Sequence, residues 1–252
     1  MNKAQLGFGI DIGGTGMKAA VVDLDKGDLA STRYRIDTPR PATPAAIAEV
    51  LRDLVDHENW TRAFGIAFPA VVRAGVVGSA ANIDDSWLDI NANELFASAT
   101  GLEVRMVNDA DAAGLAEMNF GAGRGRTGVV MMLTFGTGIG SGLFMDGVLV
   151  PNTELGHLEL DGIDAELHAS ARARRLDDLS WKQWAARVER YLKHVERLFS
   201  PELFIVGGGV SKRHDEWLHH IKIDTEVLPA VMGNNAGIVG AALVAPTAQV
   251  DV

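Results

Sequence analysis

The chain carries at residues 133–142 the sequence Leu-Thr-Phe-Gly-Thr-Gly-Ile-Gly-Ser-Gly, in which an apolar strand runs into a glycine-threonine turn. Glycine has no Cβ, so the backbone N–H groups of such a turn can come close to a phosphate. The stretch is therefore a candidate phosphate loop between two strands. We expect it to face a carboxylate across a cleft.

A second turn of the same kind occurs about 120 residues earlier. Residues 11–18 read Asp-Ile-Gly-Gly-Thr-Gly-Met-Lys, between the strands expected at 6–12 and 17–24. An ordinary hairpin would explain these glycines, but not the aspartate, threonine and lysine together. The spacing of a Walker loop occurs nowhere. The two turns suggest a weak internal repeat of two related halves, each offering a phosphate loop.

A carboxylate, Asp109, ends the apolar strand at 104–109. A carboxylate in this place can accept the proton of a hydroxyl group as a general base. The competing interpretation is that Asp109 or Asp111 caps the helix that follows, a common role of aspartate.

Residues 154–159 place two carboxylates and a histidine close together, in the order Glu-Leu-Gly-His-Leu-Glu. Hydrogen bonds to a polyhydroxylated ligand fit this set better than metal binding does, and a solvated turn is the alternative. Residues 207–209 are three glycines after a strand and before an expected helix, which suits an anion at a helix N-terminus. They lack the third glycine of the dinucleotide fingerprint, so a plain tight turn is equally compatible.

The composition excludes several classes of function. The 252 residues carry a formal charge of −10, which argues against a nucleic-acid-binding protein. The absence of cysteine excludes disulfides, thiol nucleophiles and thiolate zinc sites. No leader sequence or long apolar run is present, and we therefore expect a cytoplasmic protein that does not associate with membranes.

The periodicity of the apolar residues and the positions of turn-forming residues predict the secondary-structure elements between these motifs. The expected strands cover residues 6–12, 17–24, 29–38, 63–68, 104–109, 129–135, 142–145 and 203–206. The expected helices cover residues 44–57, 91–100, 111–120, 181–199 and 235–245, with Thr43 and Ser180 as N-caps and Gly101 closing the second helix.

Taken in order, the motifs at 11–18, 107–111, 133–142, 154–157 and 205–211 resemble those of the ROK family of sugar kinases and repressors. The resemblance spans nearly the whole chain. It implies an α/β, actin/hexokinase-like (ribonuclease H-like) fold of two domains around a central cleft. We assign residues 1–108 to a small N-terminal domain, to which the C-terminal helix at about 236–252 returns, and residues 109–235 to a larger domain.

The resemblance also implies roles for individual residues. Asp109 is similar to the family's general base for the sugar 6-hydroxyl. The implied sugar ligands are Asn82, Asn108, Asp109, Glu154, His157 and Glu166. The implied phosphate-binding residues are Gly14, Thr15, Lys18, Thr137 and Gly138, and the implied nucleotide wall is Gly207, Gly208 and Gly209. Asp11 corresponds to the residue that helps place Mg²⁺ through water.

The chain departs from many family members in one respect. Those members follow the Glu-x-Gly-His element with cysteines that bind structural zinc together with the histidine, and this chain has none. His157 is therefore expected to act on the sugar and not in a zinc site. The family's further glutamate matches best at Glu166, with Glu159 as the competitor.

Residues 154–162 and 199–209 resemble the bacterial polyphosphate glucokinases within the family, above all those of the polyphosphate/ATP glucomannokinase type. The resemblance implies transfer from inorganic polyphosphate or ATP to glucose, with mannose as a further expected acceptor. A local basic patch must then hold polyphosphate against the overall negative charge. The candidates are Lys18, Arg33, Arg35, Arg40, Arg124 and Arg126, each of which could equally be a solvated surface charge.

Three alternatives remain open. One is a strictly ATP-dependent hexokinase of the same family, and another is an ATPase of the chaperone type with a related fold. The third is a sugar-sensing regulator; such repressors carry an N-terminal helix-turn-helix, for which a first strand beginning at Leu6 leaves no room. The family also suggests a homodimer.

Overall fold

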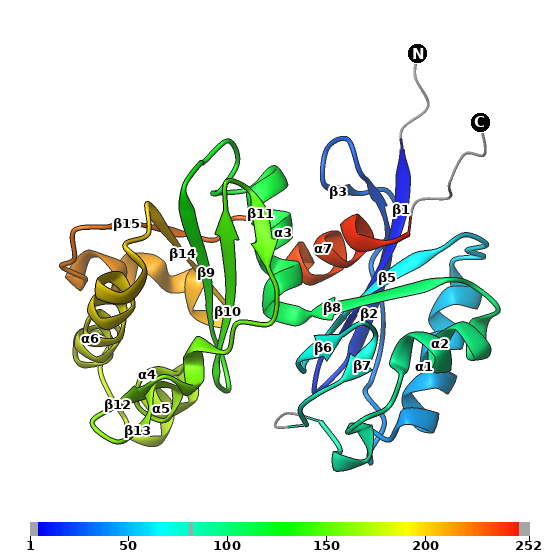
Figure 1. Ribbon diagram of the computed structural model, residues 1–252, viewed down its shortest axis with the longest axis horizontal. Helices are drawn as coiled ribbons and strands as arrows, with labels where there is room; N and C mark the ends of the chain where they lie inside the picture. The colour runs from blue at the N-terminus through cyan, green and yellow to red at the C-terminus, as the bar shows by residue number, and fades with distance from the viewer. Residues whose placement is uncertain (1–4, 81–82, 247–252) are drawn as a thin grey trace. The chain divides into compact units, whose positions relative to one another are not determined.

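The structure is a computed structural model that describes residues 5–80 and 83–246. The chain forms two compact units, one of residues 1–116 with 234–252 and the other of residues 117–233. It passes from the first unit to the second within a helix, α3 (Asp109–Phe120), and returns just before a second helix, α7 (Ala236–Val244) (Figure 1).

A mixed sheet forms the centre of the first unit. Its order is β3-β2-β1-β5-β8, and β4 also pairs with β2. The strands are β1 (Leu6–Ile12), β2 (Met17–Asp23), β3 (Asp28–Leu29), β4 (Tyr34–Ile36), β5 (Phe64–Phe68) and β8 (Val104–Asn108). Strands β1, β5 and β8 run parallel, whereas β2 is antiparallel to β1. The single strand expected at 29–38 is wrong: it is two short strands, β3 and β4, and the Ser31 hydroxyl between them accepts a hydrogen bond from the Val21 N–H.

The two faces of this sheet differ in side-chain size, as the alternation along a strand allows. Phe8, Ile10 and Ile66 are fully buried in the core that includes residues of α1 (Pro44–His57) and α2 (Ala92–Thr100). On the other face a Cβ at Gly9 would overlap with the carbonyl oxygen of Ile238, and one at Gly65 with that of Ala241. These glycines therefore let α7 lie directly on the sheet, opposite α1 and α2 (Figure 1).

The predicted helix ends of this unit are confirmed. The Thr43 hydroxyl accepts from the Ala46 N–H at the start of α1, and a proline occupies the first turn. Asn91 caps α2 in the same way, and Gly101 ends that helix with a φ of 72°.

The second unit repeats the topology of the first. Its sheet has the order β11-β10-β9-β14-β15, in which β9, β14 and β15 are parallel and β10 is antiparallel to β9. The strands are β9 (Val129–Phe135), β10 (Ile139–Met145), β11 (Val148–Val150), β14 (Leu203–Gly207) and β15 (Glu226–Pro229). Each unit thus contains an antiparallel hairpin followed by parallel strands, which confirms the internal repeat of two strand–turn–strand elements.

The core of the second unit lies between this sheet and α6 (Trp181–Phe199) (Figure 1). The ring of Phe135 packs edge-on against Trp184, Tyr191 and Trp217. A capping box of Ser180 and Gln183 begins α6 where the sequence predicted it.

Shorter elements complete the described residues. These are β6 (Val72–Arg73), β7 (Val76–Val77), η1 (Asp85–Trp87), η2 (Leu155–His157), β12 (Glu159–Leu160), β13 (Ile163–Asp164), α4 (Ala165–Ala169), α5 (Ala171–Leu176), η3 (Gly209–Glu216), η4 (Leu218–His220) and η5 (Gly233–Asn235). In this part of the chain, no helix combines the length and apolar character needed to cross a bilayer.

Candidate active site

The first predicted phosphate loop, residues 13–16, connects β1 to β2. Two side chains donate hydrogen bonds to its backbone carbonyls. The Thr38 hydroxyl donates to the carbonyl of Gly13 at 2.5 Å, and the guanidinium of Arg35 donates to the carbonyl of Thr15 at 2.7 Å. Gly14 and Thr15 are exposed, and a Cβ at Gly14 would meet no atom. The carbonyls of Gly13 and Thr15 are therefore hydrogen-bonded, while Gly14 and Thr15 at the tip of the loop remain accessible to solvent.

Asp11 and Lys18 form an ion pair at the base of this loop. The Lys18 Nζ lies 2.9 Å from the Asp11 Oδ2, and both side chains are partly exposed. Asp11 also lies against Gly237 in the first turn of α7, where a Cβ would be only 2.9 Å from the carboxyl carbon. The Asp11 carboxylate therefore lies between Lys18 and the start of α7.

Asn108, and not an aspartate, caps α3. Its Oδ1 accepts from the N–H groups of Ala110 and Asp111 at 2.8 and 3.2 Å, and its Nδ2 donates to the carbonyl of Ala70. Asn108 is buried, whereas Asp109 is exposed at the first position of the helix. The interpretation of Asp109 as the helix cap is therefore wrong, because its neighbour performs that role.

The parallel strands bring Asp109 and the first loop to the same edge of the sheet. β5 lies between β1 and β8, and its Ala67 pairs with Asp11 on one side and Val107 on the other. Neighbouring strands are about 4.8 Å apart, so the backbones of Asp11 and Val107 lie roughly 10 Å apart. Ligands of open α/β sheets bind at the carboxyl ends of such strands.

The second predicted loop, residues 136–138, connects β9 to β10 and is anchored by Glu166 of α4. The Glu166 Oε2 accepts from the Ile139 N–H at 3.1 Å, and the Arg172 N–H donates to the carbonyl of Gly136. A Cβ at Gly138 would overlap with the Glu166 carboxylate. Thr137 is exposed at the tip of the turn. Glu166 thus fixes the backbone just after the tip.

A single 3-10 turn, η2, carries Glu154 and His157 beside this loop. A Cβ at Gly156 would overlap with the carbonyl of Ile139, so only glycine allows the turn to pack there. The Ser141 hydroxyl donates to the carbonyl of Thr153 at 2.6 Å and accepts from the Leu155 N–H at 3.0 Å. The start of the turn is therefore held by β10.

Tyr191 of α6 supports the same turn. Its buried hydroxyl donates to the carbonyl of Leu155 at 3.2 Å. Burial, followed by the nearby Glu166 carboxylate, raises the pKa of Tyr191 above its ordinary value. The hydroxyl therefore remains a hydrogen-bond donor at physiological pH.

Glu154, His157 and Glu166 interact electrostatically. The loss of hydration, opposed by His157 and reinforced by Glu166, raises the pKa of the Glu154 carboxyl. The hydrogen bond to Asp164 is the main cause that raises the pKa of His157, and the charges of Glu166, Asp164 and Glu154 add to it. These three predicted sugar ligands therefore lie together in the second unit.

Asp164 orients the ring of His157. Its Oδ2 lies 2.8 Å from the imidazole Nδ1, which leaves Nε2 to face a ligand. Asp164 ends the hairpin of β12 and β13, whose turn residues Asp161 and Gly162 have φ angles of 58° and 81°. Glu159, the competitor of Glu166, pairs with Asp164 across the hairpin and lines a separate pocket described below.

The triglycine follows β14 at the edge that carries the second loop. Gly207 pairs with Thr134, and Gly208 has a φ of 82° and lies so close to the Phe135 carbonyl that a Cβ would overlap with it. The helix expected after it is a 3-10 helix, η3, with a non-helical residue at Arg213. Gly209 is open, with room for a ligand against its backbone.

Magnesium fits Asp11 in the manner typical of phosphoryl-transfer enzymes. Mg²⁺ keeps several waters and binds to one or two carboxylates together with substrate phosphates, so a cage of protein ligands is not required. Asp11 offers one carboxylate next to the exposed tip of the first loop. Across residues 5–80 and 83–246, no group of three or more metal-ligating side chains occurs.

The remaining predicted residues are one sugar ligand and the candidate polyphosphate ligands. Asn82 lies outside the described residues. Of the candidate polyphosphate ligands, Arg33 donates to Asn235, Arg126 pairs with Glu226, and Arg35 pairs with Asp37 while bracing the first loop.

Four residues that shape the site were missed from the sequence: Thr38, Ser141, Asp164 and Tyr191. Ser141 belongs to the glycine-rich motif and was within reach of the prediction. Asp164, Thr38 and Tyr191 act from elements whose contact with the loops has no local sequence signal.

Comparison with known proteins agrees with this geometry. Residues 7–174 match the family model described as ROK family. A polyphosphate glucokinase of Mycobacterium tuberculosis is 47% identical over 238 residues, which are 94% of this chain and 90% of that protein.

Two solved structures are also similar. The inorganic polyphosphate/ATP-glucomannokinase of Arthrobacter sp. strain KM superposes with a TM-score of 0.90 at 51% identity, covering 96% of this chain and 98% of that one. A ROK family glucokinase from Streptomyces griseus, in complex with glucose and AMPPNP, gives a TM-score of 0.82 at 27% identity, covering 96% and 99%.

The predicted actin/hexokinase-like α/β fold is confirmed by these neighbours, and the chain belongs to the ROK family.

Proposed function

We propose that this protein transfers a phosphoryl group from inorganic polyphosphate or ATP to the 6-hydroxyl of glucose, with Asp109 as general base. The relatives named polyphosphate glucokinase and polyphosphate/ATP-glucomannokinase support the reaction and the two donors. The glucomannokinase also supports mannose as a further acceptor.

The capping of α3 by Asn108 is the observation that carries the role of Asp109. Asn108 occupies the cap position, and Asp109 follows it as an exposed residue at the sheet edge that also bears the first phosphate loop. Asp109 accepts the proton of the 6-hydroxyl, and the oxygen attacks the terminal phosphorus of the donor. The bond from that phosphorus to the rest of the donor breaks, leaving ADP or a polyphosphate shortened by one unit.

We assign donor binding to Gly14, Thr15 and Lys18 of the first glycine loop and to Thr137 and Gly138 of the second. Phosphoryl transfer requires mainly alignment and charge stabilisation, which backbone N–H groups and a lysine provide. Mg²⁺, held through water by Asp11, would neutralise the phosphate oxygens. Gly207, Gly208 and Gly209 form the wall against the nucleotide when ATP is the donor.

The sugar is bound by Asn82, Asn108, Glu154, His157 and Glu166. His157 offers Nε2 because Asp164 occupies Nδ1. Asn108 carries a second hydrogen on Nδ2 that its bond to Ala70 does not use. Glu166 is preferred to Glu159 because its charge acts on both Glu154 and His157.

Replacement Asp109→Asn tests the general base. We expect turnover to fall by about 10²-fold or more while KM for glucose changes by less than about threefold. Asp53→Asn makes the same chemical change at an exposed position of α1 and is the matched control. Near-normal turnover of Asp109→Asn would exclude Asp109 as the base.

An assay of glucose, mannose and N-acetylated sugars against ATP and polyphosphate tests the substrates. Transfer from ATP alone would support the rival function, a strictly ATP-dependent ROK hexokinase. The AMPPNP-bound relative from Streptomyces griseus is consistent with that rival. Sugar binding without any transfer would favour a sugar-sensing regulator. We further propose a homodimer located in the cytoplasm.

A further inference from the structure

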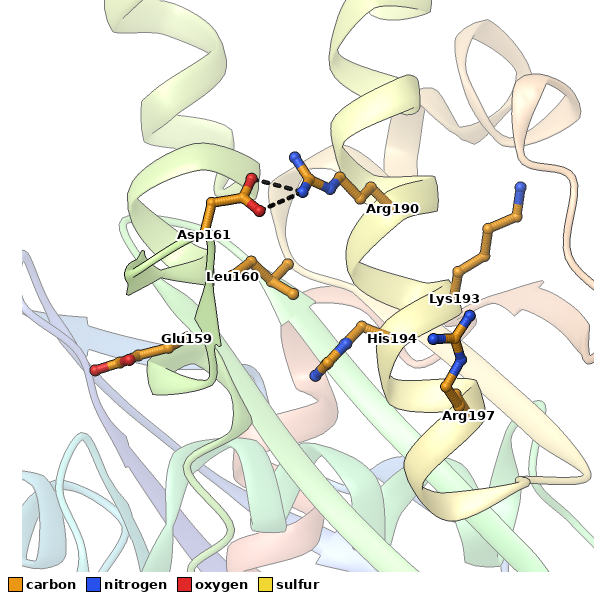
Figure 2. Close-up of a pocket in the computed structure, with 7 residues that line it drawn as sticks. All are labelled: Glu159, Leu160, Asp161, Arg190, Lys193, His194 and Arg197. Carbon is orange, nitrogen blue, oxygen red and sulfur yellow. Dashed lines mark hydrogen bonds and ion pairs between the residues drawn. The ribbon is translucent and has the colours of Figure 1, made fainter.

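A pocket of about 330 Å³ lies in the second unit between α6 and the β12–β13 hairpin, outside the residues assigned to the reaction (Figure 2). The lining residues are Glu159, Leu160, Asp161, Arg190, Lys193, His194 and Arg197.

The basic residues of this pocket form one stripe of α6. Positions 190, 193, 194 and 197 follow the helical spacing that puts side chains on a common face. Both acidic residues of the same helix accept backbone hydrogen bonds: Glu189 accepts from the Lys222 N–H at 2.8 Å, and Glu196 accepts from the Thr225 N–H at 2.6 Å. Neither is among the residues that line the pocket, although Glu189 also pairs with Lys193.

Only one carboxylate in the pocket is directed at these cations. Asp161 bonds to Arg190 at 2.6 Å, whereas Figure 2 shows the Glu159 carboxylate pointing away from α6. His194 projects from α6 toward the hairpin in the same view. Lys193 bonds to Glu189 of its own helix. Arg190 and Lys193 are thus paired with Asp161 and Glu189. Within the described residues, no side-chain hydrogen bond or ion pair engages Arg197 or His194, in a chain whose formal charge is −10.

We propose that this pocket binds a linear polyphosphate chain at phosphates remote from its reacting end. The inference rests on the proposed use of polyphosphate as a donor. A guanidinium binds phosphate oxygens in a bidentate manner, and each phosphate of the chain carries a negative charge that Arg190, Lys193 and Arg197 can meet in turn. The ion pair of Arg190 and Asp161 is exposed, and little stability opposes its replacement by phosphate.

The hairpin links this pocket to the candidate sugar site. Asp161 at the hairpin turn lines the pocket, and Asp164, three residues later, bonds to His157. The backbones of Asp161 and Asp164 lie at most about 10 Å apart, the length of three residues of extended chain. A long polyphosphate can reach beyond the reacting phosphates, whereas ATP offers no phosphate beyond its third. The pocket is therefore expected to favour long polyphosphate over ATP.

The double variant Lys193→Gln/Arg197→Gln tests the proposal. The matched control, Arg175→Gln/Lys182→Gln, removes the same charge from exposed positions of α5 and α6 that do not line the pocket. Binding of fluorescently labelled long-chain polyphosphate is measured by anisotropy for wild type and both variants. The KM values for long polyphosphate, tripolyphosphate and ATP are determined in parallel.

Loss of two charge-assisted contacts should weaken binding of the long chain about tenfold. The KM ratio of long polyphosphate to ATP should rise by a similar factor, whereas the control should stay within about twofold of wild type. Equal binding by the pocket variant and the control, or no binding by wild type, would overturn the proposal. Pocket-dependent binding without transfer from polyphosphate would support the pocket and refute only the proposed donor.

Discussion

The carboxylate of Glu166 accepts a hydrogen bond from the Ile139 N–H, 3.1 Å away, and fills the space where Gly138 would carry a Cβ. One side chain from α4 thus fixes the backbone of the second glycine loop. This arrangement predicts unequal effects of alanine at neighbouring positions of the turn.

Gly138→Ala should lower kcat/KM for the phosphoryl donor by about tenfold or more, because the new methyl group displaces Glu166 or the loop. Gly136→Ala, whose Cβ meets no atom, should lose several-fold less. Steady-state kinetics with varied donor at saturating glucose measure both variants. Equal losses would show that Glu166 does not constrain the loop.

Asp164→Asn should lower the pKa of His157, because the hydrogen bond to Asp164 is the main cause that raises it. NMR titration of the His157 imidazole measures the shift, with the other histidine resonances as internal references. The KM for glucose should rise as well, since the ring loses its orientation. An unchanged titration would contradict the assigned pair.

The same pair predicts a pH-dependent contribution to stability. A histidine whose pKa is raised in the folded state stabilises that state fully below its unfolded value of about 6.5, and the effect disappears as pH rises through the folded pKa. Asp164→Asn should therefore lower the unfolding midpoint more at pH 5.5 than at pH 9. The difference should be small because both side chains are exposed. A larger effect at pH 9 would contradict this sign.

Gly9→Ala should destabilise the first unit by about 3 kcal/mol or more, because the methyl group overlaps with the Ile238 carbonyl of α7. Gly7→Ala, on the same strand, meets only the flexible end of Leu24 and should cost much less. Denaturant unfolding compares the two. Similar losses would indicate that α7 does not pack directly on β1.

Ser141→Ala should raise the KM for glucose and destabilise the second unit by about 1–3 kcal/mol. The Leu155 N–H loses its acceptor and the Thr153 carbonyl loses a donor, which frees one end of η2. Ser98→Ala, at an exposed position of α2, is the control. Steady-state kinetics and denaturant unfolding measure both variants, and an unchanged KM of Ser141→Ala would separate this serine from the sugar site.

Local signals sufficed for much of the fold. The Thr43 and Ser180 caps and the apolar spacing located α1 and α6 because these features act within a few residues. The hairpin of β12 and β13 and the short helices α4 and α5 were missed. Each is only a few residues long and is stabilised by contacts distant in sequence, such as Trp184 Nε1 donating to the Ala169 carbonyl.

In the candidate site as well, features with a local sequence signal were predicted and features that depend on backbone geometry were not. The glycine loops were visible as motifs, and their positions at strand ends are confirmed. The capping role of Asn108 was not visible, because Asn108, Asp109 and Asp111 are all plausible caps and only backbone geometry selects one. The bond between Asp164 and His157 depends on the Asp161-Gly162 turn, a hairpin signal that is present in the sequence but was not used in the prediction.

The return of α7 to the first unit has a consequence for synthesis on the ribosome. The second unit is one continuous segment, whereas the β1–β5 surface stays uncovered until residues 236–244 emerge. In a nascent chain, all residues of the second unit are therefore available before those of the first unit. Strands β1 and β5 are synthesised early but can contact α7 only at the end of synthesis. During that interval, the face around Gly9 and Gly65 lacks the helix that covers it in the folded unit.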